Sequence, residues 1–375
     1  MKFNVSSKTL YNYASAVNKV INAKNALSIL NNFLLRLDGE TLTITGSDVE
    51  NSLTATLAVT DVEGGGAFCI EAKRFVDILK EIPDQGIEIS VDTHGNVHLT
   101  YSSGEYDFMA IDGADYPQYQ NDEDDSEPQT FTCPASTIAR GIKNTIFAVS
   151  TDDYRPQMMG VFFDIKPDQI IFVATDTRKL VKFTDSGVAP GITASCIIPT
   201  KPAQILSSVF DGEEEVTFSL SRKSASISSS SFTFNCRFIQ GNFPDYNRVI
   251  PRSNTLTLTA DRVTLLNAVR RVGLFVSQEY GLEKFRITPD SVEIKSEDNN
   301  LQMFARDKVP CSFTGESLII GFGSNYLIEV LNIITSDDVV VDLADPGRPG
   351  IFRPSENAEN TELIMLLMPM TVGSF

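Results

Sequence analysis

Two histidines, His94 and His98, are the side chains of this sequence best suited to metal binding or general acid–base catalysis. They are the only histidines in the chain, and they flank Gly95 and Asn96 in a segment that reads as a β-hairpin. On one strand face they could bind a metal ion together, but no third ligand type lies nearby. We therefore interpret them as part of a surface hairpin and predict no metal site.

The other motifs that could do chemistry also favour a non-catalytic protein. Residues 64–66 are three glycines without the Lys-Ser/Thr pair of a phosphate-binding loop, so a flexible turn is predicted. The acidic run at 122–125 could bind a cation weakly, although contiguous like charges usually form a solvated linker. The five cysteines are scattered without a CxxC pair, which is typical of reduced thiols in a cytosolic protein. We predict no enzymatic activity and no cofactor.

The elements that carry these residues follow a threefold internal repeat. Residues 35–48, 163–176 and 285–298 align without gaps, at offsets of 128 and 122. Each copy contains two alternating apolar–polar runs joined by a short turn, which predicts a β-hairpin. A period of about 125 residues is too long for a solenoid unit, so we predict one domain used three times.

A predicted helix precedes each hairpin and another follows it. The first helices are expected around 9–21, 136–149 and 262–276. The second helices end in the aliphatic pairs 78–79, 205–206 and 330–331, and strands follow at 87–91, 216–218 and 339–343. This order predicts an α+β fold in which each domain has two helices packed on antiparallel sheets.

Length and composition define the expected domains. The chain of 375 residues divides into three domains of ordinary size. They are predicted at residues 1–120, 128–250 and 251–375, and residues 121–127 are predicted to be an acidic, solvated linker. Because no run of eighteen apolar residues and no signal-peptide pattern occurs, we expect a cytoplasmic protein without a membrane span.

The distribution of charge indicates a polyanionic partner. The net charge of −18 by itself argues against nucleic-acid binding. However, the first helix of each repeat lies in a segment with Lys or Arg and no Asp or Glu, although the chain has 49 acidic residues. A buried apolar helix would exclude both signs, so a surface that faces phosphates is favoured. Its predicted phosphate-binding residues are Lys24, Arg140, Lys143, Arg270 and Arg271.

Together these features resemble the bacterial DNA polymerase III beta subunit, the replicative sliding clamp. The resemblance rests on residues 1–3, 25–35, 42–48, 173–176, 179–180, 241–251 and 368–370, and it spans the whole chain. It implies three clamp domains per chain and a homodimer that closes head-to-tail into a six-domain ring. Such a ring encircles double-stranded DNA without reading its sequence and tethers the polymerase, which gives processivity without catalysis.

The resemblance also implies two protein-binding surfaces. Ring closure is expected to bring Arg74, Tyr106 and Phe108 of one chain against Leu274 and Phe275 of the other. A pocket for short extended peptides is expected from Met158, Thr175, Leu180, Pro244, Arg248, Val249, Leu366, Leu367, Met368, Pro369 and Met370. Taken singly, the interface aromatics are better explained by the sequence alone as core residues of their own domains, and Leu180 and Val249 could also be ordinary core residues.

The implied partners are the replicative polymerase alpha subunit, the clamp loader, repair polymerases, ligase and mismatch-repair proteins, through short clamp-binding peptides. The sequence departs from the family pattern at Thr177 and Arg178, where Gly and His are common, and in residues 371–375, which continue past Met370. Residues 346–350 align too poorly for a role to be transferred. An adhesion or carbohydrate-binding protein would also explain the repeats, but not the acid-free basic helices.

Overall fold

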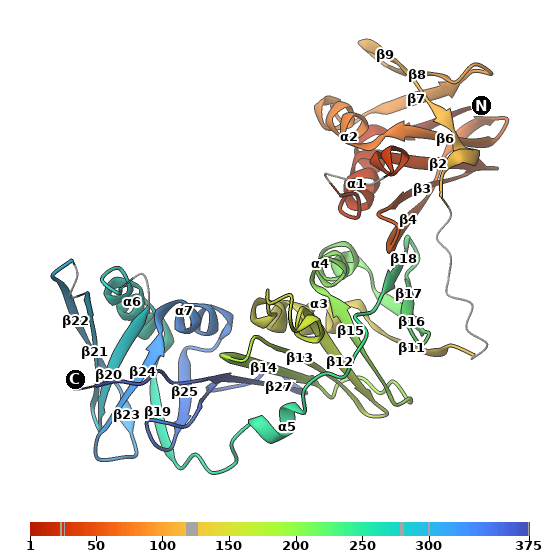
Figure 1. Ribbon diagram of the computed structural model, residues 1–375. Helices are drawn as coiled ribbons and strands as arrows, with labels where there is room; N and C mark the ends of the chain where they lie inside the picture. The colour runs from red at the N-terminus through yellow and green to blue at the C-terminus, as the bar shows by residue number, and fades with distance from the viewer. Residues whose placement is uncertain (23–24, 26, 118–126, 278–280, 299–300, 374) are drawn as a thin grey trace. The chain divides into compact units, whose positions relative to one another are not determined.

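The computed structural model describes residues 1–22, 25, 27–117, 127–277, 281–298, 301–373 and 375 (Figure 1). The chain forms two compact units. One contains Met1–Ala139 and Lys201–Phe238, and the other contains Arg140–Thr200 and Ile239–Phe375. Each unit therefore includes part of the middle repeat, and the reason lies in the sheet pairing described below.

The three repeats contain equivalent elements in the same order. The first has β1 (Lys2–Ser6), α1 (Ser7–Asn18), β2 (Asn32–Asp38), β3 (Thr41–Ser47), β4 (Asn51–Ala58), β5 (Thr60–Glu63), β6 (Gly66–Glu71), α2 (Ala72–Glu81), β7 (Gly86–Val91), β8 (Asn96–Tyr101), β9 (Gly104–Met109) and β10 (Ile111–Asp112). The second has β11 (Gln129–Pro134), α3 (Ala135–Thr145), β12 (Gly160–Lys166), β13 (Gln169–Thr175), β14 (Lys179–Asp185), β15 (Ala194–Pro199), α4 (Thr200–Val209), β16 (Glu215–Leu220), β17 (Ser224–Ser228), β18 (Phe232–Arg237) and α5 (Tyr246–Val249). The third has β19 (Leu256–Asp261), α6 (Arg262–Gly273), β20 (Leu282–Thr288), β21 (Ser291–Asp298), β22 (Met303–Pro310), β23 (Ser312–Phe313), β24 (Leu318–Gly323), α7 (Ser324–Ile333), β25 (Asp338–Leu343), β26 (Gly350–Pro354) and β27 (Thr361–Leu367).

The predicted hairpins are confirmed, with one register in all three repeats. They are β2–β3, β12–β13 and β20–β21, and the equivalent opposed pairs are Leu35 with Ile44, Phe163 with Phe172, and Phe285 with Ile294. All six of these side chains are buried. Since a slip of one residue would turn every apolar side chain to the other face of its sheet, the alternating pattern is sufficient to set this register.

The predicted helices are also present, but the first helix of each repeat ends earlier than its sequence pattern indicated. Helix α1 ends at Asn18, α3 ends at Thr145 and α6 ends at Gly273. Side-chain caps begin two of them, since Ser6 accepts a hydrogen bond from the Thr9 amide and Asp261 accepts one from the Thr264 amide. Helix α1 packs against α2, and α6 packs against α7.

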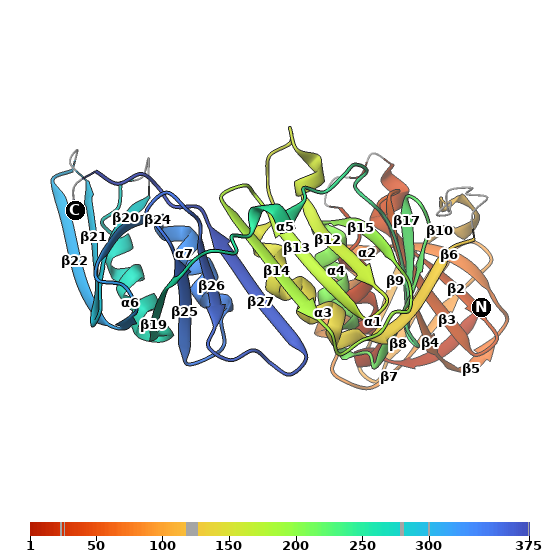
Figure 2. The same cartoon turned by 90° about the horizontal axis from the view of Figure 1, so that it is seen from below.

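The strands form four antiparallel sheets, two of which cross a repeat boundary. Sheet A has the order β5-β1-β7-β8-β9, and sheet D has the order β22-β21-β20-β24. Sheet B (β10-β6-β2-β3-β4-β18-β17-β16-β11) joins the first repeat to the second through β4 and β18. Sheet C (β15-β12-β13-β14-β27-β26-β25-β19-β23) joins the second to the third through β14 and β27, which lie side by side in Figure 2. These shared sheets explain why the compact units cut the middle repeat.

The fold therefore confirms the predicted α+β class with three repeated domains. Within the described ranges, no helix combines the length and apolar composition needed to cross a bilayer.

Candidate functional surfaces

The residues first considered for catalysis do not form a catalytic site in the described part of the chain. His98 lies on β8, where its Nδ1 contacts the Asp107 carboxylate on β9, and His94 lies in the β7–β8 turn. Among the described residues, no group of three His, Cys, Asp or Glu side chains could hold a metal ion. The glycines at 64 and 65 lie in the β5–β6 connection, as predicted for a turn.

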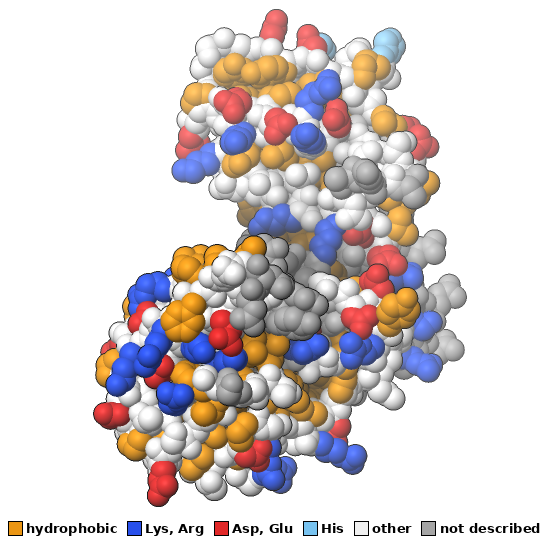
Figure 3. Space-filling model, turned by 60° about the vertical axis from the view of Figure 1, so that its left-hand side comes forward, with side chains coloured by type: hydrophobic (Ala, Val, Ile, Leu, Met, Phe, Trp, Pro, Cys, Tyr) orange, Lys and Arg blue, Asp and Glu red, His pale blue; other side chains and the backbone are white. Residues whose placement is uncertain are grey.

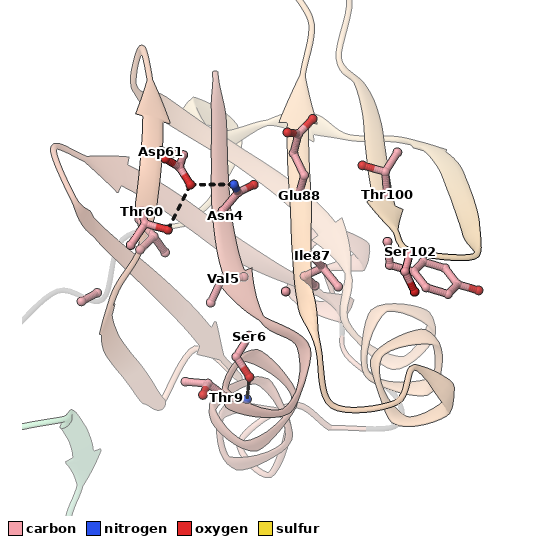
Figure 4. Close-up of a pocket in the computed structure, with 14 residues that line it drawn as sticks. Asn4, Val5, Ser6, Thr9, Thr60, Asp61, Ile87, Glu88, Thr100 and Ser102 are labelled. Carbon is pink, nitrogen blue, oxygen red and sulfur yellow. Dashed lines mark hydrogen bonds between the residues drawn. The ribbon is translucent and has the colours of Figure 1, made fainter.

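A broad depression in the first repeat also lacks the predicted site residues. It has a volume of about 820 Å³ and lies over sheet A. Its lining includes both polar and apolar groups, and Asn4 among them donates a hydrogen bond of 2.8 Å to Asp61 (Figure 4). The Thr60 hydroxyl in its lining donates to Asp61, but no His or Cys is among the described residues that line the depression, so we assign it no chemistry.

An apolar cluster on sheet C gathers several residues of the predicted peptide pocket. Leu180 on β14 and Leu366 on β27 face each other across the strand pair and pack with Tyr246 and Ile351. Phe243 is stacked on Phe162 at a centroid distance of 4.6 Å beside this cluster. Leu180 is only 3% exposed, so it forms the floor of this surface and is also part of the core.

Strand alternation separates two neighbouring residues that the sequence analysis grouped in one pocket. Leu366 opposes Leu180, whereas Leu367 opposes Lys179. Directly opposed residues share a face of a sheet, and successive residues alternate. Leu366 therefore lies on the Tyr246 side, and Leu367 lies on the side where Lys179 meets Tyr326 of α7.

Helix α5 holds the exposed rim of the same surface. Tyr246 at its first position donates a hydrogen bond of 2.6 Å from its hydroxyl to Asp164. Burial and this bond raise the pKa of Tyr246, so the hydroxyl remains a donor. Arg248 pairs with Asp245 at 2.9 Å, and Val249 is 47% exposed. Because Val249 is an apolar side chain left in solvent beside an apolar cluster, it marks a surface suited to an apolar partner.

The other predicted pocket residues lie around this surface or beyond it. Met158 and Thr175 are buried, Pro244 and Pro369 are half-buried, and Met368 is 39% exposed. Met370 instead pairs with Gly321 of β24, to whose carbonyl its amide donates a hydrogen bond of 2.8 Å. The structure therefore brings Leu180 and Leu366 together under α5, and it attaches Met370 to the edge of sheet D.

The turn between β13 and β14 has a strained residue. Thr177 has a φ of +76°, a conformation that β-branched residues rarely adopt. The Oδ1 of Asp176 accepts hydrogen bonds of 2.8 Å from the amides of Arg178 and Lys179, and the hydroxyl of Thr175 accepts one from the Thr177 amide. These bonds hold the turn in spite of the strain.

Two of the predicted interface residues of the first repeat, Arg74 and Phe108, line a small cavity. Phe108 on β9 meets Phe75 of α2 edge to face at a centroid distance of 6.4 Å. A cavity of about 240 Å³ lies beside them and is also lined by Arg74. Tyr106 is stacked on Tyr101, and both β9 side chains remain partly accessible. Tyr106 and Phe108 are therefore neither fully buried in the core nor fully exposed.

The predicted interface residues of the third repeat lie immediately after α6. Leu274 is 77% exposed and Phe275 is 36% exposed. Two adjacent large apolar side chains in solvent are a typical mark of a protein–protein contact.

The predicted DNA-binding side chains lie on α3 and α6, but acids from neighbouring strands reach two of them. Arg140 pairs with Asp185 at 2.6 Å, and Arg271 pairs with Asp307 at 2.6 Å. The helices are free of acids in sequence, yet the surface around them is not, and Figure 3 shows basic side chains interspersed with acidic ones. This mixture lowers the local positive potential.

The remaining basic candidates differ in their surroundings. Arg270 donates a hydrogen bond of 2.9 Å to Asn332 of α7, and Lys143 is exposed on α3. Lys24 lies outside the described residues.

Residues from distant elements complete these surfaces, and the sequence pattern did not predict them. Tyr246 and Ile351 complete the apolar cluster, and Asp185 and Asp307 neutralise basic residues. No local spacing rule identifies the acids, because each lies on a different element from its arginine. The related segments 115–119 and 242–246 make Tyr246 equivalent to Tyr119, which lies outside the described residues.

Comparison with known proteins extends over the whole chain. Residues 1–120, 132–245 and 247–370 match the N-terminal, central and C-terminal domains of the DNA polymerase III beta subunit, in that order. The beta sliding clamp of Proteus mirabilis is 29% identical over 375 residues, which cover 99% of this chain and 100% of that protein. The clamp of Escherichia coli strain K12 is 26% identical over 372 residues, with coverages of 99% and 100%.

Solved structures show the same similarity. The sliding clamp of Pseudomonas aeruginosa superposes with a TM-score of 0.91 at 25% identity, covering 99% of this chain and 100% of that one. A clamp from Bartonella birtlesii, solved bound to griselimycin, gives a TM-score of 0.91 at 26% identity with the same coverages.

Proposed function

Because this chain belongs to the DNA polymerase III beta subunit family, the beta sliding clamps, it is a non-catalytic processivity factor of DNA replication, and we propose that two copies close head-to-tail into a ring around duplex DNA. The proposed domains are residues 1–120, 128–250 and 251–375, joined by the linker 121–127, and the proposed location is the cytoplasm.

The observation that carries the ring proposal is a strand pairing that occurs twice within the chain. The fourth strand of one repeat pairs with the last strand of the next, as β4 with β18 and β14 with β27. The fourth strand of the third repeat is β22, and β9 is the strand of the first repeat that is equivalent to β18 and β27. Both β22 and β9 are sheet edges among the described strands. Open edges favour strand addition. A head-to-tail partner would give β22 and β9 the same pairing a third time.

The internal pairs also predict the register of this contact. Phe234 opposes Leu53, and Met365 opposes Val181. The hairpin registers make Tyr106 equivalent to Phe234 and Met365. They also make Ala305 equivalent to Leu53 and Val181. We therefore expect Tyr106 to oppose the partner's Ala305, and Glu105 to oppose the partner's Arg306.

Both side chains of that charged pair are exposed in the chain described. Apolar contact would come from Phe108 and the small cavity beside Arg74, which would receive Leu274 or Phe275 of the other copy.

A charge exchange tests this register. Glu105→Arg should weaken the dimer because it would place two arginines in opposition, and Arg306→Glu should weaken it likewise. The two changes together should restore much of the affinity, measured by sedimentation at several concentrations. If the double variant is weaker than either single variant, the proposed register is wrong.

We propose that DNA is held by phosphate contacts alone, from Lys24, Arg140, Lys143, Arg270 and Arg271. Replacing Arg270 with Glu should weaken DNA binding equally for unrelated sequences and reduce its salt dependence, because phosphate contacts carry no base information. Filter binding of two unrelated duplexes at several salt concentrations measures this. A loss confined to one sequence contradicts the proposal.

The apolar surface of sheet C is proposed to dock short extended peptides of the polymerase alpha subunit, the clamp loader, repair polymerases, ligase and mismatch-repair proteins. Its proposed lining is Met158, Thr175, Leu180, Pro244, Arg248, Val249, Leu366, Met368, Pro369 and Met370, and Leu367 is left out because it lies on the opposite face of sheet C. The support is an exposed apolar rim beside a buried apolar floor. Unbranched methionines at the rim suit a surface that accepts several partners.

The rim residues give the sharper test, because Leu180→Asp would put an unpaired charge into the core and destabilise the fold as well. Val249→Asp should weaken binding of the purified polymerase alpha subunit at least tenfold, measured without DNA. Val263→Asp on α6 is the matched control, since Val263 is 48% exposed and Val249 is 47% exposed. Equal affinities of the two variants would contradict the proposed docking surface.

A further inference from the structure

Two residues described after Met370, Val372 and Phe375, contact sheet D. Val372 packs on Gly321 of β24, where an added Cβ would lie 2.6 Å from the Val372 Cγ1 and 2.9 Å from the Met370 carbonyl oxygen. Any side chain at position 321 would therefore displace the C-terminal segment. Because glycine at 321 leaves this space, the sheet accommodates the segment closely.

The end of the chain is held by a second, independent contact. The ring of Phe375 lies 4.0 Å from the guanidinium carbon of Arg286 on β20. Phe285 and Ile287 on either side of Arg286 are buried, so Arg286 projects from the opposite face of sheet D, away from α6. A cation beside an aromatic ring is attracted by the electron-rich ring face.

Met370 precedes both of these contacts in the chain and is itself held against sheet D. Its amide is bonded to Gly321, and its sulfur lies 3.8 Å from the position that a Cβ would take on Gly323. The ring of Tyr326 lies 2.9 Å from that same position. Met370 is thus fixed on both sides, whereas a chain that stopped at Met370 would place a flexible, charged terminus there.

We propose that Arg286 and Phe375 are positioning residues for the peptide-docking surface: together with the contact of Val372 on Gly321, they hold the segment after Met370 as a strap that keeps Met370 in the conformation a partner peptide requires. This inference rests on the proposed docking function of that surface. A preformed site loses less conformational entropy on binding than a mobile one. The strap therefore raises partner affinity although neither clamping residue touches the partner.

The strap itself can be tested without any partner. The chain has no tryptophan, so Phe375→Trp introduces a single tryptophan whose emission can be followed separately from that of the tyrosines. We expect acrylamide to quench this tryptophan less in the Phe375→Trp protein than in the same protein carrying Arg286→Gln. Arg353→Gln is the matched control, because Arg353 is 40% exposed and paired with one carboxylate, and Arg286 is 41% exposed and likewise paired. If Arg286→Gln leaves quenching unchanged, the strap is not held as described.

The positioning role needs a readout at Met370. With ¹³C-methyl methionine, Arg286→Gln and Phe375→Ala should each shift the Met370 methyl resonance and leave that of Met158 in place. Each should weaken polymerase alpha subunit binding about three- to tenfold, the size of one cation–π contact. The double variant should be no weaker than either single one. Unchanged affinity together with a shifted Met370 resonance would overturn the positioning role.

These outcomes separate the two proposals. If Val249→Asp leaves polymerase affinity unchanged, the docking surface is wrong whatever the strap does. If Val249→Asp abolishes binding but Arg286→Gln and Phe375→Ala do not weaken it, the docking surface stands and the strap has no role in it.

Discussion

The ammonium group of Lys179 in the second repeat contacts the carboxylate of Glu329 in the third. Lys179 is almost fully buried, with Asp176 at 3.6 Å and the ring centroid of Tyr326 at 4.9 Å. It follows the strained turn at Thr177 directly and opposes Leu367 across the strands that join the two repeats. One buried cation thus links the turn, the shared sheet and helix α7.

Loss of this cation should destabilise the protein. Lys179→Met keeps much of the side-chain volume but leaves Asp176 and Glu329 without their partner, so we expect the free energy of unfolding to fall by about 1–3 kcal/mol. Glu329→Gln should cost less, because Glu329 is 41% exposed and water can replace the lost contact. Urea denaturation of both variants measures the difference. A larger loss for Glu329→Gln would contradict this account.

A buried carboxyl group in the third repeat should make stability depend on pH. Glu283 is fully buried, with the hydroxyl of Ser324 beside its carboxyl group. Burial raises the pKa of Glu283 to about 8. Because the folded pKa lies above the unfolded one, the native state binds the extra proton, and stability falls as pH rises from about 4.5 towards 8, at about 1.4 kcal/mol per pH unit.

Glu283→Gln should therefore flatten the stability profile over that range and stabilise the protein at pH 8. Thermal unfolding between pH 5 and 8 tests this, with Glu316→Gln as the control because Glu316 is exposed. Parallel profiles for Glu283→Gln and the unmodified chain would show that Glu283 does not titrate in this window.

Relief of strain in the β13–β14 turn should stabilise the fold. Thr177 has a φ of +76°, and glycine adopts this conformation without the steric cost paid by a β-branched residue. We expect Thr177→Gly to raise the free energy of unfolding by about 0.5–1 kcal/mol, measured by urea denaturation. Thr177→Ala retains a Cβ and should give a smaller gain. An equal effect of the two changes would exclude strain as the cause.

Removal of an acid beside a predicted DNA-binding arginine should strengthen DNA binding. Asp307 pairs with Arg271 at 2.6 Å, so part of the arginine's charge is neutralised locally. Asp307→Asn should raise DNA affinity. It should also steepen the slope of log affinity against log salt concentration by about one, because one more phosphate counterion is released. The control is Asp345→Asn, because the carboxylate of Asp345 pairs with Arg348 in the β25–β26 connection. If both variants bind DNA alike, Arg271 does not contact phosphates.

The sequence by itself determined the repeated domain, because hairpin register depends on local information. An apolar residue at every second position selects one face of a sheet, and a turn sets the pairing, so residues 35–48, 163–176 and 285–298 predicted the same hairpin three times. The ends of the helices were less well determined, since a cap or a short 3₁₀ turn, such as residues 146–148 after α3, ends a helix within an apolar pattern that continues.

Only the tertiary structure decided which side chains share a surface. It separated Leu366 from Leu367 because strand alternation sends them to opposite faces, and it brought Asp185 to Arg140 and Asp307 to Arg271 from other elements. It also decided that Leu180 is both floor and core. Contacts of this kind join residues far apart in the chain, and their energies depend on burial and on the local dielectric, neither of which is encoded in the spacing of residues along a single sequence.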